Sequence, residues 1–507
     1  MKKRNIGLAV SYTNTFLNMI VGLFLSSFLL RQLGDTEYGI YQTIASFANY
    51  LVLLEFGTGT VMARNLSVCR SNGETQLQIE KNISTIWSIT NILALVIAVV
   101  SVAFYFSLDF LYASSLTHEQ IVSGKNIFVF ITIYLIALFY VQTLNGLMLA
   151  YEDYTYSSST SIFRIILRTL LLVVLLINIR QAIIIAIVDA VLSILLAVFG
   201  SVYAKRKFKV KINVKNFDAS IFKASLPLCL AIFLQGIINQ ANSNVGKFIL
   251  GVNVGPEVVS LYSVGLYVYN IFASISTIPL SIYVPQVTKD VAQGKRGREL
   301  TNTLVQPSRL IVIVSGSVLF GFFAAGRQFV NIVYGDEYSL AWMLAIILIA
   351  PMFINMTIEI VTNVLDAINK RLTRSLILLI NTGANILLTI VLINRMGITG
   401  AAISTGACML LQVLLLCIYY CKKIKINAFY LFYKAYKGIL IYQILGAIVG
   451  FAVGKFIPNV YLSFLASGVV YVSIAFSGFL LFGKNAEEKI MINNLLGKVF
   501  KRIKNQM

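Results

Sequence analysis

The feature of this sequence that most constrains its fold is a series of long, continuous apolar runs. A helix that crosses a bilayer needs about 20 mostly apolar residues, whereas the strands of a membrane barrel show alternating segments of about 10 residues. Fourteen runs along the 507 residues have the helical length. The sequence therefore predicts an all-α polytopic membrane protein with about 14 transmembrane helices. Their expected starts are near Ile6, Tyr38, Ile83, Lys125, Ser157, Gln181, Lys223, Val258, Ser308, Leu340, Ser375, Thr399, Lys437 and Tyr461.

The composition supports a membrane location. Hydrophobic residues make up 58% of the chain and charged residues 12%. The mean hydropathy of +0.83 exceeds what a soluble chain of this length sustains. The first apolar run, from Ile6 to Leu30, is too long for a signal peptide, and no small-residue cleavage site follows it. We therefore expect this run to be retained as a helix.

The chain also repeats itself in the same orientation, with an offset close to 217 residues. The motif at Arg31–Gly34 recurs at Lys247–Gly251, and the apolar segment ending at Ile177 aligns with the segment ending at Ile393. Two parallel repeats in a membrane protein enclose a cleft, in which transporters commonly bind their substrate. We expect an N-terminal lobe over 1–217 (helices 1–6), a C-terminal lobe over 218–434 (helices 7–12), helices 13 and 14 over 435–483, and a cytoplasmic amphipathic tail over 484–507.

The basic residues indicate the orientation. If the N-terminus is inside, 32 of the 41 Lys and Arg residues fall in inner segments, the bias expected of cytoplasmic loops. The sequence therefore predicts a multi-pass protein of the bacterial cytoplasmic membrane with both termini in the cytoplasm. Because topology and attraction to anionic lipid account for the net charge of +21, we expect no nucleic-acid partner.

The outer loops argue against an enzyme. The longest expected one, 108–124, has about 17 residues, and none of the five cysteines lies in an outer loop. The sequence contains no Walker loop, no Cys/His metal spacing and no Ser/His/Asp set, and its one histidine, His118, reads as a surface residue. We expect no catalytic residues, no metal and no cofactor.

Three stretches carry a resemblance to a known family. RQLGDTEYGIYQ (31–42), EFGTGTVMAR (55–64) and FVNIVYGDEYSLAWMLAIILIAPMF (329–353) resemble the patterns of bacterial polysaccharide-export flippases, the Wzx-type family of the MOP superfamily. The resemblance implies that the protein moves polyprenyl-diphosphate-linked oligosaccharide repeat units from the inner to the outer leaflet, for a cell-surface polymer such as capsule or O-antigen. The implied partners are this lipid-linked glycan and membrane lipids. Other polysaccharide-assembly membrane proteins are candidate partners.

Two alternatives stay open. A multidrug or cation antiporter of the same superfamily is disfavoured because the predicted helices 1 and 7 carry no carboxylate for a cation. A membrane polysaccharide polymerase or ligase is disfavoured because it would need a sizeable outer loop. The sequence does not reveal the glycan, the coupling ion, the oligomeric state or the type of cell envelope.

The most distinctive charges are Arg164 and Arg168, one helical turn apart in the predicted fifth helix. At the offset of 217 residues their counterparts are the amides Asn381 and Asn385, so only one lobe carries this charge. Guanidinium groups bind phosphate oxygens in a bidentate way, and the pair is a candidate clamp for a diphosphate. The alternative is an internal ion pair with Glu55, Asp189, Glu359 or Asp366.

Further candidates for the cleft are polar side chains on three predicted helices. Their amide and hydroxyl groups suit sugar recognition, and the alternative is hydrogen bonding between helices in a dry interface. Arg31 and Lys247 are repeat partners near the outer helix ends, so they are candidates for the exit, with snorkelling to head groups as the alternative. The polar candidates are Asn14 and Asn18 on helix 1, Asn239 on helix 7, and Tyr267 and Asn270 on helix 8.

Three carboxylates are candidate coupling or gating residues. Glu359 and Asp366 lie on one polar stripe of the predicted tenth helix. Glu359 either carries a coupling proton or cation or neutralises an arginine. Glu55, about nine residues before Arg64 at the inner end of the second helix, is predicted to make a structural or gating contact.

Overall fold

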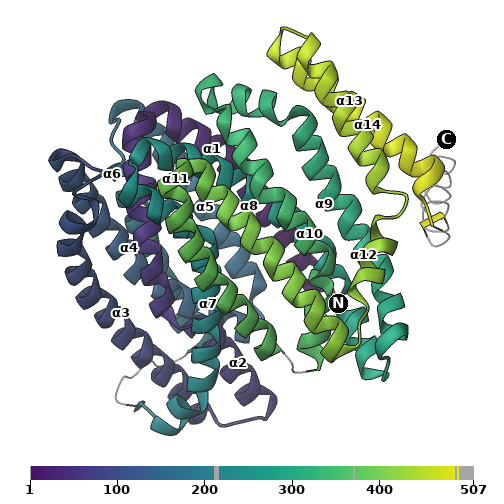
Figure 1. Cartoon of the computed structure of the whole chain (residues 1–507). Helices are drawn as coiled ribbons and strands as arrows, with labels where there is room; N and C mark the ends of the chain where they lie inside the picture. Colours follow the sequence, from purple (N-terminus) through teal and green to yellow (C-terminus); the bar gives the residue numbers. More distant parts are fainter. Residues whose placement is uncertain (1, 210–215, 369–370, 486–487, 490–507) are drawn as a thin grey trace, which may run out of the picture. The chain divides into compact units, whose positions relative to one another are not determined.

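The computed structural model describes residues 2–209, 216–368, 371–485 and 488–489 (Figure 1). Every regular element in these ranges is a helix, which confirms the prediction of an all-α protein. The chain divides into two compact units, each with its own packing. Unit 1 is Met1–Val264 with Thr382–Ser404, and unit 2 is Gly265–Asn381 with Thr405–Met507.

Unit 1 contains the first seven long helices. Within it α4 packs against α6 and α2, and α1 packs against α5 and α7. Its elements are α1 (Lys2–Ala48), the 3₁₀ helix η1 (Asn49–Glu55), α2 (Thr58–Ser71), α3 (Gln76–Tyr112), α4 (His118–Ala150), α5 (Tyr154–Asn178), α6 (Ile183–Phe208), α7 (Ala219–Asn253) and the first turns of α8 (Pro256–Ala292), together with the middle of α11 (Arg371–Tyr419).

Unit 2 contains the remainder of α8 and α11 and the C-terminal helices. Here α13 and α14 pack against each other and against α9. Its other elements are α9 (Gly297–Tyr334), the 3₁₀ helix η3 (Asp336–Tyr338), α10 (Leu340–Ala367), the π-helix η4 (Tyr420–Ile424), α12 (Ala428–Tyr436), α13 (Leu440–Phe456), α14 (Val460–Gly478) and the π-helix η5 (Phe479–Gly483).

The number of spans follows from two glycine breaks. Eleven helical segments of the described chain are long and apolar enough to cross a membrane, or twelve if the bent pair α12–α13 is one span. Two of them, Leu17–Ser71 and Thr373–Ile424, run for 55 and 52 residues, which is more than twice the ~20 residues that one span needs. Each is broken at a glycine of positive φ, Gly34 (φ 76°) or Gly397 (φ 58°), a conformation that glycine adopts readily. Counted as two spans each, they bring the total to the predicted fourteen.

Local capping explains where several helices begin. Thr75 and Thr117 each accept a hydrogen bond from the backbone three residues on, and Gln78 and Gln120 return it, forming capping boxes at α3 and α4. Asp153 caps α5 by accepting from the Tyr156 N–H. These caps satisfy N–H groups that helix starts leave without a partner.

Small residues set the spacing of α2 and α4 in unit 1. A Cβ atom added at Gly146 would lie 2.0 Å from the carbonyl oxygen of Gly59, and one added at Gly59 would lie 2.4 Å from the carbonyl oxygen of Gln142. No side chain fits at such distances. The two backbones therefore touch directly, as small residues permit in membrane helices.

The predicted lobes 1–217 and 218–434 stay a prediction. The boundary between the compact units differs from theirs, because α7 belongs to unit 1. Most of the predicted amphipathic tail over 484–507 lies outside the described residues, which include only 484, 485, 488 and 489 of it.

Candidate functional site

Helix α5 presents two different faces. Five large apolar side chains on one face are exposed, as expected of a surface in contact with lipid. Arg164 and Arg168 lie on another face, on either side of Ile166 at the midpoint of the helix. Both guanidinium groups are therefore deep in a segment with the length and hydropathy of a membrane span. The exposed side chains are Phe163, Ile166, Leu170, Val174 and Ile177.

Arg168 forms an ion pair with Asp189 of α6. Its Nε donates to Asp189 Oδ1 at 2.5 Å and its Nη2 donates to Oδ2 at 2.9 Å, a bidentate geometry. The side chains are 27% and 11% exposed. Tyr41 of α1 and Tyr134 of α4 lie close enough to interact with this guanidinium electrostatically. The alternative of an internal ion pair, with Asp189 among the possible partners, is therefore what the structure shows for Arg168.

Among the described residues Arg164 has no such partner. Its Nη2 lies 3.4 Å from Ser193 Oγ of α6, and its guanidinium carbon lies 5.6 Å from the ring centroid of Tyr134. No described carboxylate lies within 4 Å of it. A guanidinium group keeps its charge inside a membrane and is costly there without a counter-ion. We call Tyr41, Tyr134, Arg164, Arg168, Asp189 and Ser193 the arginine cluster.

Lys247 is a second cation of unit 1 without a described carboxylate partner. Its Nζ donates to Gln42 Oε1 at 3.4 Å, and Gln42 Nε2 in turn donates to the Tyr38 hydroxyl at 2.9 Å. Tyr38 also lies near Arg168, so this chain of contacts extends toward the arginine cluster. Arg31 is exposed on α1, three residues before the break of that helix.

Glu55 lies at the start of α2 and is fully engaged there. Its carboxylate accepts from the N–H groups of Gly57 and Gly59, at 3.0 and 3.3 Å, and from the Thr58 hydroxyl at 2.7 Å. An anion at a helix N-terminus is favourable because the N–H dipoles point toward it. Through Thr58 the contact continues to the Thr143 hydroxyl at 2.9 Å. This geometry is that of a structural contact at a bend in the chain.

Glu359 of α10 in unit 2 is paired with Arg374 near the start of α11, a residue that was not among the predicted site residues. Both its oxygens accept from Arg374 Nη2, at 2.8 and 3.0 Å, and Oε1 also accepts from the Thr362 hydroxyl at 3.1 Å. The Arg374 side chain is 9% exposed. Of the two roles considered for Glu359, its contacts match the neutralisation of an arginine. The available signal in the sequence was that Arg371 and Arg374 open α11 only a few residues after α10 ends.

The remaining polar candidates are distributed over both units. Asn18 is exposed on α1 in unit 1, whereas Tyr267 is half-buried and Asn270 exposed on α8 in unit 2. The side chains of the other three candidates lie outside the described part of the chain: Asn14, Asn239 and Asp366.

Comparisons with known proteins agree with this architecture. A family model described as "Polysaccharide biosynthesis protein" matches residues 6–291. A curated relative, the probable low-salt glycan biosynthesis flippase Agl15 of Haloferax volcanii, is 26% identical over 160 residues, which is 31% of this chain. The match spans about a third of the relative's length, 33%.

Two solved structures share the fold. The lipid II flippase MurJ in an inward closed conformation has a TM-score of 0.69 and 17% identity, over 93% of this chain and 99% of that one. An inward-facing multidrug resistance transporter of the MATE family, MOP superfamily, has a TM-score of 0.62 and 12% identity, over 82% and 95%. A flippase and a multidrug resistance transporter therefore have this fold in common, and the fold alone does not choose between them.

The family model confirms the resemblance to polysaccharide-export proteins that the sequence motifs indicated. The named relatives are flippases and transporters, in agreement with the expectation that the protein is not an enzyme. Since the family model covers more than half of the chain, this membrane protein belongs to the polysaccharide biosynthesis protein family.

Proposed function

We propose that the protein is a flippase that moves polyprenyl-diphosphate-linked oligosaccharide repeat units from the inner to the outer leaflet of the cytoplasmic membrane by alternating access. The observation that carries this proposal is Arg164, a cation in the middle of a membrane helix without a described carboxylate partner. A cation in that position is favourable once an anionic group of the substrate reaches it. Family membership and the likeness to named flippases support the same assignment.

Within the arginine cluster the two arginines have different roles. Arg164 is the ligand of the substrate diphosphate, because among the described residues its guanidinium is engaged only by a 3.4 Å contact to Ser193 and by the Tyr134 ring. Arg168 is a positioning residue, because Asp189 holds it in a bidentate pair. A guanidinium group presents two parallel N–H donors to phosphate oxygens, a geometry that lysine lacks. We assign Lys247 as a second contact of the same anion along its path.

The state of the carboxylates favours this function over cation antiport. A transported cation needs carboxylate oxygens, and three described ones inside the spans are already engaged. Glu55 caps α2, Asp189 pairs with Arg168, and Glu359 pairs with Arg374. Arg164 and Lys247, in contrast, have no described carboxylate partner. This excess of positive charge suits an anionic substrate.

The test is export by Arg164→Ala and Arg164→Lys variants in cells that depend on this protein for a surface glycan. We expect Arg164→Ala to abolish surface polymer and to accumulate lipid-linked precursor in the inner leaflet, with normal protein level. Arg164→Lys should restore export in part. The matched control is Arg180→Ala, since Arg180 is exposed between α5 and α6. Wild-type export by Arg164→Ala would overturn the assignment.

A further inference from the structure

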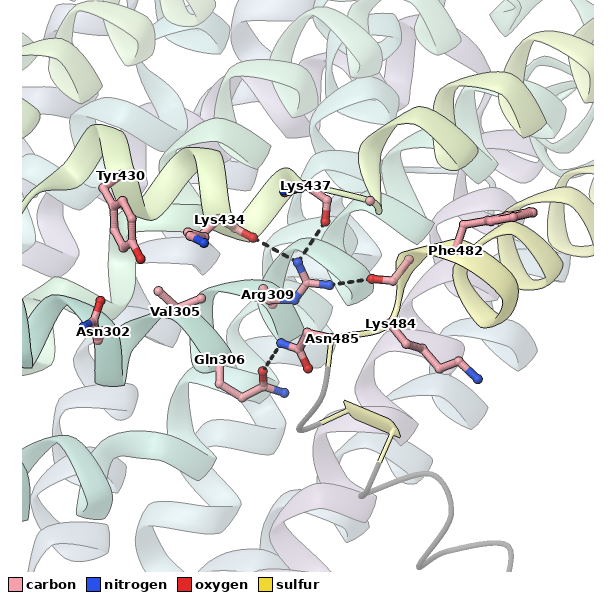
Figure 2. A pocket seen from close by; sticks show the side chains of 12 residues that line it. Asn302, Val305, Gln306, Arg309, Tyr430, Lys434, Lys437, Phe482, Lys484 and Asn485 are labelled. Carbon is pink, nitrogen blue, oxygen red and sulfur yellow. Dashed lines mark hydrogen bonds between the residues drawn. The ribbon is translucent and has the colours of Figure 1, made fainter.

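Unit 2 contains a polar pocket that the proposed transport mechanism does not use. It has a volume of ≈ 570 Å³ and lies between α9, α12 and the segment that follows α14 (Figure 2). Residues from these three places reach it although α9 precedes α12 by more than a hundred positions and α12 precedes the last segment by more than forty. The lining residues are Asn302, Val305, Gln306, Arg309, Tyr430, Lys434, Lys437, Gly438, Phe482, Gly483, Lys484 and Asn485.

Arg309 holds the walls of this pocket together. Its Nε and Nη2 donate to the two carboxylate oxygens of Glu488, at 2.8 and 3.0 Å. Its Nη1 donates to the backbone oxygens of Lys434 and Lys437, both at 2.9 Å, and Nη2 also donates to that of Gly483 at 2.8 Å. All five N–H donors of the guanidinium are therefore used. Glu488 balances its charge, so Arg309 is an anchor and not a ligand.

The charge of the pocket comes from three lysines. Lys434 lies in the last turn of α12, and Lys437 directly follows that helix. Lys484 directly follows η5, on the other side of Arg309 (Figure 2). Within the described residues none of the three ammonium groups has a carboxylate within 4 Å, and no acidic side chain lines the pocket. Gln306 accepts from Asn485 Nδ2 at 2.9 Å through its oxygen, which leaves its NH₂ group to donate. The pocket is thus built to receive an anion that accepts hydrogen bonds.

The surface beside the pocket is apolar. Phe482, which lines it, and Leu481 are each 72% exposed, and Phe429 and Tyr433 of α12 are 61% and 59% exposed. A small soluble anion would leave these apolar side chains uncovered, whereas the acyl chains of a lipid would cover them. Charge and apolar surface together therefore favour an amphiphile with an anionic head group.

The sequence positions of the lining residues also favour a lipid of the cytoplasmic leaflet. The three walls come from the basic segments 285–309, 422–437 and 483–507, which the distribution of Lys and Arg predicts on the cytoplasmic side. The inner leaflet is rich in anionic lipid, and basic pockets between membrane helices on that side bind phosphate head groups.

We propose that this pocket binds the phosphate head group of an anionic phospholipid of the inner leaflet, with Lys434, Lys437 and Lys484 as its ligands. The bound lipid joins α12 and the end of α14 to α9, where Arg309 already joins their backbones. The site is separate from the arginine cluster of unit 1, and the proposal does not depend on what the protein transports.

The experiment measures lipid binding to the purified full-length protein by native mass spectrometry, with phosphatidylglycerol titrated against phosphatidylcholine. The test variant is Lys434→Gln/Lys437→Gln/Lys484→Gln. We expect it to bind phosphatidylglycerol about 100-fold more weakly than the wild type, with about a fivefold loss from Lys434→Gln alone. The control variant removes three exposed lysines of the same unit and the same net charge: Lys289→Gln/Lys422→Gln/Lys423→Gln.

Three outcomes would overturn the proposal. The first is unchanged binding of phosphatidylglycerol by the test variant, or an equal loss in the control. The second is that inorganic phosphate at millimolar concentration displaces the phospholipid, which would make the ligand a soluble ion. The third is that a polyprenyl diphosphate binds this site more tightly than the phospholipid does, which would make it a substrate site. Because none of the three lysine Nζ atoms donates a hydrogen bond within the described residues, the variant should fold, and its melting temperature in phosphatidylcholine should match that of the wild type.

Discussion

Replacement of Arg168 by methionine separates the structural role of the arginine cluster from its anion-binding role. Methionine keeps much of the side-chain volume but leaves the Asp189 carboxylate, 11% exposed, without its bidentate partner. Removal of one member of a buried ion pair costs about 3–5 kcal/mol. Since 27% of the Arg168 side chain is accessible, we take the lower limit and expect the free energy of unfolding to fall by about 3 kcal/mol.

A double-mutant cycle checks this value. Arg168→Met/Asp189→Asn removes both charges at nearly constant volume, so most of the lost stability should return, and the coupling energy should be about 2–3 kcal/mol. Arg164→Met, which loses a 3.4 Å contact and a ring contact, should cost less than about 1 kcal/mol. The measurement is unfolding in mixed micelles with increasing denaturing detergent. A stable Arg168→Met variant, or a double variant no more stable than the single one, would refute the reasoning.

Three further predictions concern packing, a second ion pair and pH. Gly146→Ala should lower the free energy of unfolding by about 1–3 kcal/mol, because the added Cβ meets a backbone oxygen of α2 at 2.0 Å. Gly468→Ala is the control, since a Cβ there meets nothing within 4 Å. It should be neutral in the same thermal unfolding assay. Glu359→Gln should lower the level of folded protein in membranes because it leaves Arg374 without a counter-ion, and Arg374→Met should rescue it; a folded, active single variant would contradict this. Burial raises the pKa of Asp153, which lies between α4 and α5, but hydrogen bonds from a lysine ammonium and a tyrosine hydroxyl outweigh it and lower the pKa below its ordinary value. Its stabilising effect is present above the ordinary pKa and is lost as the pH falls through the lowered one, so melting curves of the wild type and Asp153→Asn should differ at neutral pH and converge in acid.

The fold class could be predicted from the sequence, as could the division into spans once the two long segments are each counted as two. A bilayer requires helices of about 20 apolar residues whose backbone groups are satisfied internally, so length and hydropathy were sufficient. The two glycine breaks did not obscure the count, because each separates two apolar runs of the sequence. The sequence also identified Arg164 and Arg168 as exceptional, since charge inside a span is rare for a physical reason.

Only the tertiary structure decided which arginine is paired. In a symmetric hairpin, residues equally far from the middle of the α5–α6 connection would face each other. Ser193 would then lie opposite Arg168, and Asp189 would lie one turn away. The observed register is shifted by that one turn, so Asp189 meets Arg168 and Ser193 meets Arg164. The register of two membrane helices depends on how their side chains interdigitate, which no local pattern encodes. The same holds for Arg309 in unit 2, whose carbonyl and carboxylate partners lie more than a hundred residues away and become neighbours only through packing.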